Sequence, residues 1–81
     1  MTDLFEEIKR MISNQFGIPL EDIEEDSLLD EDLSIAELDL EDLIAQIQTK
    51  YDINIPSNKT ASFKKVSDIV SFLYENAQDS G

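Results

Sequence analysis

The chain has 81 residues, of which 41% are hydrophobic, and its 6 basic and 19 acidic side chains give a formal net charge of −13. It contains no cysteine and no histidine, which excludes disulfide bonds, thiolate nucleophiles, imidazole bases and the usual zinc ligands. The length predicts one small domain with a modest hydrophobic core.

The N-terminal segment predicts a first helix over residues 3–16. Its apolar residues recur at helical spacing, and Gly17 supplies a stop signal: these residues are Leu4, Phe5, Ile8, Ile12 and Phe16. The segment is charged throughout, and no run of the sequence has the length of a signal-peptide core or a membrane span. We therefore expect a cytoplasmic protein that does not insert into membranes.

A long acidic loop is predicted after this helix. Residues 21–42 hold 12 of the 19 acidic side chains, and no Lys or Arg occurs between Arg10 and Lys50. This charge has the same sign as nucleic-acid phosphates, so nucleic acid is not an expected partner. The natural complement is a basic protein surface, although the acids could also serve only to keep a small domain soluble.

The remaining sequence predicts three further helical segments. A second helix over residues 35–50 has one apolar face at spacings of three and four: Leu40, Leu43, Ile44, Ile47 and Tyr51. A short helical turn is expected within residues 57–62, and a last helix over residues 66–76 places Val66, Ile69, Val70 and Leu73 inward. We expect an all-α domain over residues 1–76 and a flexible tail over residues 77–81.

Four ordered segments of the chain resemble the acyl carrier protein family. They are Phe16-Gly17-Ile18, Glu31-Asp32-Leu33, Tyr51-Asp52-Ile53-Asn54-Ile55-Pro56, and the set Phe63, Val66, Val70 and Leu73. The resemblance implies a small four-helix bundle with three main helices, one short helix and a long loop between the first two helices. Members of this family carry acyl chains on a phosphopantetheine arm, which is esterified to the serine of an Asp-Ser-Leu motif at the start of the second helix.

In the ungapped register, Glu37 occupies the position of that serine. The motif falls on Ala36-Glu37-Leu38, 19 residues before Pro56, which is the usual separation in the family. A carboxylate has no hydroxyl to attack the pyrophosphate of coenzyme A. We therefore expect no phosphopantetheine at this position.

Two other serines are possible substitutes for the attachment site. Ser27 lies in a literal Asp-Ser-Leu tripeptide, but it is 29 residues before Pro56 and an acidic stretch follows it. Ser34 precedes Glu37 by one helical turn, and its neighbours do not reproduce the motif. We expect Ser27 to cap a turn of the acidic loop instead.

Local chemistry offers two roles for Glu37. Ser34-Ile35-Ala36-Glu37 has the S-x-x-E pattern of a capping box, in which each side chain accepts from the other residue's backbone amide. The Glu37 carboxylate would also interact favourably with the positive end of the helix dipole. Alternatively, or in addition, it could imitate the phosphate of a loaded carrier.

Two further readings of the carboxylates are less well supported. Asp30, Asp32, Ser34 and Glu41 occupy positions 1, 3, 5 and 12 of a calcium-binding EF-hand loop, but Ile35 replaces the glycine that position 6 requires. We expect no defined metal site, although loose binding of divalent cations stays open. Glu37 and Glu41 could do acid-base chemistry only in a cleft; the sequence predicts none, so no enzyme is expected.

The expected function is that of a monomeric, non-enzymatic docking module without a prosthetic group. Its docking face on the second helix would comprise Leu38, Asp39, Glu41, Asp42, Ala45 and Gln48. By resemblance, the partner would be an enzyme of fatty acid or polyketide biosynthesis with a basic patch; carriers commonly have an apolar residue where this chain has Glu41. The alternative is a working acyl carrier protein that is modified at another serine, or a variant of one.

Overall fold

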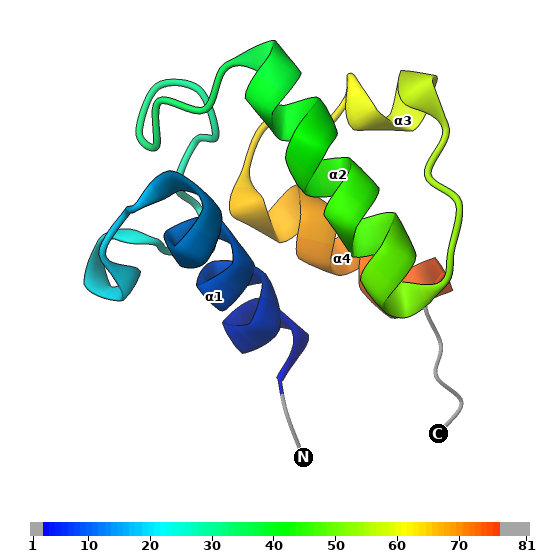
Figure 1. Cartoon of the computed structure of the whole chain (residues 1–81), viewed down its shortest axis with the longest axis horizontal. Coiled ribbons are helices and arrows are strands. Elements are labelled where there is room, and N and C mark those ends of the chain that lie inside the picture. The colour runs from blue at the N-terminus through cyan, green and yellow to red at the C-terminus, as the bar shows by residue number, and fades with distance from the viewer. Residues whose placement is uncertain (1–2, 77–81) are drawn as a thin grey trace.

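The computed structural model describes residues 3–76 and shows a bundle of α-helices (Figure 1). The elements are α1 (Leu4–Phe16), the 3₁₀ turn η1 (Leu20–Asp22), α2 (Glu37–Tyr51), α3 (Ser57–Thr60) and α4 (Val66–Asn76). The described residues contain no strand, so the predicted all-α architecture with three main helices and one short helix is confirmed. The predicted tail, residues 77–81, lies outside the described residues.

Both ends of α1 follow from local sequence signals. Asp3 is the N-cap, and its carboxylate accepts a hydrogen bond of 3.3 Å from the Phe5 amide. Gly17 has a φ of 69°, a left-handed conformation that side chains disfavour, and its amide donates to the Ser13 carbonyl at 2.9 Å. Glycine adopts this conformation without steric penalty, so the predicted stop at Gly17 is confirmed.

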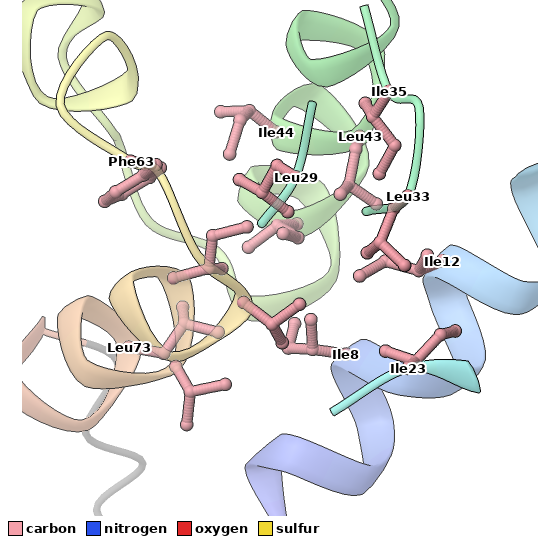
Figure 2. Packing of buried hydrophobic residues seen from close by; sticks show 14 of the residues in the cluster. Ile8, Ile12, Ile23, Leu29, Leu33, Ile35, Leu43, Ile44, Phe63 and Leu73 are labelled. Atoms are coloured by element: carbon pink, nitrogen blue, oxygen red, sulfur yellow. The ribbon is translucent and has the colours of Figure 1, made fainter. Parts of the chain in front are cut away.

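One hydrophobic cluster joins the three main helices (Figure 2). Its fully buried members include Ile8 and Ile12 of α1, Leu43 and Ile47 of α2, and Leu73 of α4. Burying each such side chain contributes roughly 1.5–3 kcal/mol relative to leaving it in water. No helix within residues 3–76 is long and apolar enough to cross a membrane.

The acidic loop between α1 and α2 is anchored to the segment before α4. The Leu29 amide donates to the Lys64 carbonyl at 2.9 Å, and the Val66 amide donates to the Ser27 carbonyl at 3.2 Å. Leu28 and Lys65 form an isolated antiparallel bridge. The sequence predicted a long acidic loop here, but it did not reveal this bridge or the turn η1.

The start of α2 differs from the prediction by two residues. Ile35 is buried, with only 3% of its surface exposed, and its amide donates to the Leu29 carbonyl at 2.8 Å. Ser34 before it has a φ of 58°, and Ala36 after it is the N-cap in an extended conformation. The helix therefore begins at Glu37 rather than Ile35, because Ile35 is held in the core by a non-helical backbone.

This geometry overturns the predicted capping box. Ser34 is not the N-cap, Glu37 is not at the third helical position, and α2 has no side-chain cap hydrogen bond. The left-handed conformation of Ser34 costs roughly 1–2 kcal/mol. Burial of the Ile35 side chain offsets a cost of that size, so tertiary packing prevails over the local capping motif.

A hydrogen bond between side chains connects the C-terminal end of α2 with α1. The Tyr51 hydroxyl donates to the Glu7 carboxylate. Burial of the phenol, then this hydrogen bond and the negative charge of Glu7, raise the pKa of Tyr51 well above its ordinary value of 10.0. The neutral phenol is therefore the form that the folded state favours.

This preference predicts a stability difference between the wild type and Tyr51→Phe that depends on pH. The pKa in the folded state is raised, so the phenol's contribution is complete below the unfolded value of 10.0 and is lost as the pH rises above it. We expect the unfolding free energy of the wild type, relative to the variant, to fall from about pH 9 upward. Urea unfolding at a series of pH values measures this difference, and a constant difference up to pH 11 would contradict it.

The uncapped start of α2 predicts that Ala36→Ser stabilises the protein. Ala36 already has the extended backbone of an N-cap, and a serine hydroxyl there can accept from an amide in the first turn. The unfolding free energy should rise by about 0.5–2 kcal/mol, measured by thermal or urea unfolding. Ser34→Ala is the control and should change the unfolding free energy by less than about 0.5 kcal/mol. If this variant instead lost as much unfolding free energy as an N-cap contributes, the capping box would be shown to form.

Candidate functional site

Glu37 is an exposed carboxylate at the first position of α2. It shares the first turn of the helix with Asp39, so two negative charges lie near the positive end of the helix dipole. Each such charge contributes roughly 0.3–1 kcal/mol at an exposed position. Glu37 thus stabilises α2 by its charge, without the reciprocal hydrogen bonds of a capping box.

The structure gives the two substitute serines different environments. Ser27 is buried, and its hydroxyl oxygen accepts a hydrogen bond of 3.0 Å from the Glu24 amide. Ser27 therefore caps a turn of the acidic loop, as the sequence indicated. Ser34 is exposed in the non-helical segment before α2. Of these two hydroxyls, only that of Ser34 is accessible to a modifying enzyme.

The expected docking face is almost entirely exposed. Its largest apolar side chain, Leu38, has 76% of its surface in contact with solvent. The other exposed members are Asp39, Glu41, Asp42 and Ala45. The single ion pair within residues 3–76 joins Lys9 to Glu6, so no basic side chain of that segment neutralises the acids of α2.

Gln48 has a different role from the rest of this face. It is half-buried, and its side-chain oxygen accepts a hydrogen bond of 2.7 Å from the Ile55 amide. Gln48 therefore holds the segment between α2 and α3 against the helix. The exposed part of the predicted docking face therefore excludes Gln48 and runs from Leu38 to Ala45 in the first half of α2.

A hollow of about 740 Å³ lies beside α2, where the sequence predicted no cleft. Its lining includes Glu37, Leu40, Glu41 and Ile44, which recur at helical spacing and so share one face of α2. The remaining lining residues come from the acidic loop, the segment after α2, α3 and the segment before α4: Leu29, Asp30, Ile35, Ile55, Ser57, Thr60, Ala61, Phe63 and Lys64. Glu37 and Glu41 are therefore two of the exposed residues that line an open hollow.

Five of the residues that line this hollow are buried apolar side chains. Figure 2 labels Leu29, Ile35 and Ile44 near α2 and Phe63 on the segment before α4, and all four line the hollow. All four side chains are buried, as is Ile55. The sequence predicted Ile35 on a helix and gave Ile55 and Phe63 no role at a site; the available signal was that both are large apolar residues in the connections on either side of α3.

The carboxylates of the EF-hand pattern serve the loop itself. Asp32 accepts a hydrogen bond of 2.8 Å from the Leu28 amide, and Asp30 accepts one of 2.7 Å from the Glu31 amide. Within residues 3–76, no three acidic side chains are grouped so that they could hold a metal ion. The loop geometry is therefore explained by its own hydrogen bonds.

Comparison with known proteins identifies relatives over most of the chain. An acyl carrier protein of Onion yellows phytoplasma is 33% identical over 73 residues, which cover 90% of this chain and 96% of the relative. One of Chlamydia muridarum is 32% identical over 72 residues, covering 89% and 94% of the two chains. One of a Sulfurovum species is 30% identical over 70 residues, covering 86% and 93%.

No family model matches the chain, but the alignments cover 93–96% of the length of these relatives. Each of them is named an acyl carrier protein. Such identity over such coverage is sufficient to assign the family. The chain belongs to the acyl carrier protein family.

Proposed function

We propose that this chain is a member of the family that lacks phosphopantetheine, has no catalytic activity and acts as a docking module for basic protein surfaces. The observation that carries the proposal is the exposed carboxylate of Glu37 at the first position of α2. By the resemblance stated above, this is where carriers have the serine that bears the arm.

The residues at the start of α2 do not fit the arm. Its attachment requires a hydroxyl, and Ala36, Glu37 and Leu38 offer none. Ser27 is buried and accepts from a backbone amide. The exposed hydroxyl of Ser34 is the basis of the alternative, in which the chain is a working carrier of fatty acid or polyketide biosynthesis.

Charge supports the docking role. Asp39, Glu41 and Asp42 are exposed on α2, and they surround the exposed apolar side chain of Leu38. Such a surface attracts a basic patch over a long range and accelerates its encounter with the domain. The proposed partner is an enzyme of fatty acid or polyketide biosynthesis in the cytoplasm, bound by a single copy of this chain.

The absence of an arm predicts that the wild type gains no mass when it is incubated with coenzyme A and a broad phosphopantetheinyl transferase. Intact-mass spectrometry measures this directly. Ala36→Asp/Glu37→Ser, which restores the Asp-Ser-Leu motif, is the matched variant, and we expect it to gain the mass of one phosphopantetheine. A gain by the wild type would contradict the proposal, and a gain mapped to Ser34 would establish the alternative.

The docking role predicts that Asp39→Lys/Asp42→Lys weakens binding to partner enzymes with basic patches. We expect a loss of about tenfold at 50 mM salt, together with a flatter dependence of affinity on salt. Surface plasmon resonance against a panel of fatty acid and polyketide enzymes measures both effects. Glu21→Lys/Asp22→Lys in η1 makes the same change of charge away from α2, and equal losses in the two variants would refute a docking face on α2.

A further inference from the structure

Helix α1 and the turn η1 border an open surface pocket of about 580 Å³, which we call the α1–η1 pocket. Three apolar side chains line it: Phe5 of α1, Leu20 of η1 and Ile23 directly after η1. Ile23 is buried and Phe5 is half-buried, whereas Leu20 has 42% of its surface exposed. A ligand that covers Leu20 would therefore remove from water an apolar side chain that the fold leaves partly exposed.

Acidic side chains surround these apolar residues. Four exposed carboxylates line the pocket: Glu21, Glu24, Glu25 and Asp26. Lys9 is the basic residue among the lining side chains, and its ammonium group lies 3.7 Å from the Glu6 carboxylate and 5.0 Å from the centre of the Phe5 ring. That ion pair is the single one within residues 3–76, so the four carboxylates have no ion-pair partner in the described segment.

Hydrogen bonds and burial hold the acidic side of the pocket in place. The Glu24 amide donates to the Ser27 hydroxyl oxygen at 3.0 Å, and the Glu25 carbonyl accepts from the Ser67 amide of α4 at 2.9 Å. The residue before them, Ile23, is anchored in the core by its buried side chain. Because this backbone is already ordered, a ligand binds without the entropy cost of ordering a mobile loop.

These features select the chemistry of a binding partner. The negative charges attract Lys and Arg side chains, and an Arg guanidinium can donate two hydrogen bonds to one carboxylate. The apolar residues among the acids suit a large apolar side chain that loses its contact with water on docking. A metal ion is a poorer match, because no three acidic side chains within residues 3–76 are grouped so that they could hold one.

We propose that the α1–η1 pocket is a second docking site, which binds a basic peptide segment of a partner protein through one large apolar side chain flanked by Lys or Arg. In the view of Figure 1, α1 lies between η1 and α2. The pocket shares no residue with the proposed docking face on α2, so the two sites are independent. With both sites occupied, the domain joins two proteins.

Synthetic pentapeptides with blocked ends test the role of the apolar side chain. Arg-Lys-Leu-Lys-Arg, Arg-Lys-Ser-Lys-Arg and Ser-Ser-Leu-Ser-Ser are each titrated into ¹⁵N-labelled full-length protein at about 150 mM salt, which screens long-range attraction. We expect the first peptide to shift the amide signals of Lys9, Leu20 and Ile23 most, and to bind at least about fivefold tighter than either of the others. Equal binding of the two basic peptides, or shifts centred on α2, would overturn the proposal.

A matched pair of variants tests the apolar contact. Leu20→Gln should weaken the binding of Arg-Lys-Leu-Lys-Arg about fivefold, because it removes the exposed apolar side chain of the pocket without changing the charge. Leu38→Gln makes the same change at the exposed leucine of α2, and it should alter the binding by less than about twofold. A stronger effect of Leu38→Gln would place the peptide on α2 and refute the site.

A second pair tests the charges. Glu24→Gln/Glu25→Gln should weaken this peptide roughly 3- to 10-fold, as expected for the loss of two exposed ion pairs. Asp39→Asn/Asp42→Asn removes the same charge from α2 and should weaken the peptide by less than about twofold. Equal weakening would mean attraction by overall charge only, which refutes the site. Because pantetheine attachment is read by mass and docking on α2 by a different pair of variants, a failure of the proposed function is distinguishable from a failure of this site.

Discussion

The burial of Ile35 is the constraint on which the candidate site depends. Its side chain lies in the core, and its amide is bonded to the Leu29 carbonyl, so the chain must be non-helical at this point. The helical conformation becomes available only after Ala36, which makes Glu37 the first residue of α2. Ile35 also lines the hollow beside α2. One buried side chain therefore fixes the start of the helix, the position of its first carboxylate and part of the cavity.

The elements that the sequence predicted well are those whose signals are local. Helical spacing and the stop at Gly17 gave α1, and spacing alone gave α4 with its inward residues. The start of α2 was wrong, because a capping motif at Ser34 competed with core burial of Ile35 and a capping motif contributes less than a buried isoleucine. The hollow was missed because residues from five separate segments line it, and no local pattern records how such segments meet.

The unbalanced charge of the chain opposes folding. With −13 charges and a single ion pair in the described segment, the acidic side chains repel one another. The folded state offsets part of this repulsion where carboxylates accept from backbone amides, as Asp30 and Asp32 do, or stand in the first turn of a helix. The acids of α2 that lie beyond that turn have no such compensation, and their charge is available to a partner.

The hollow and the acidic face of α2 share Glu41, so they are not independent surfaces. This side chain is exposed beside Asp42 on the docking face and also stands at the rim of the cavity. A basic partner on the proposed docking face would therefore also cover part of the hollow.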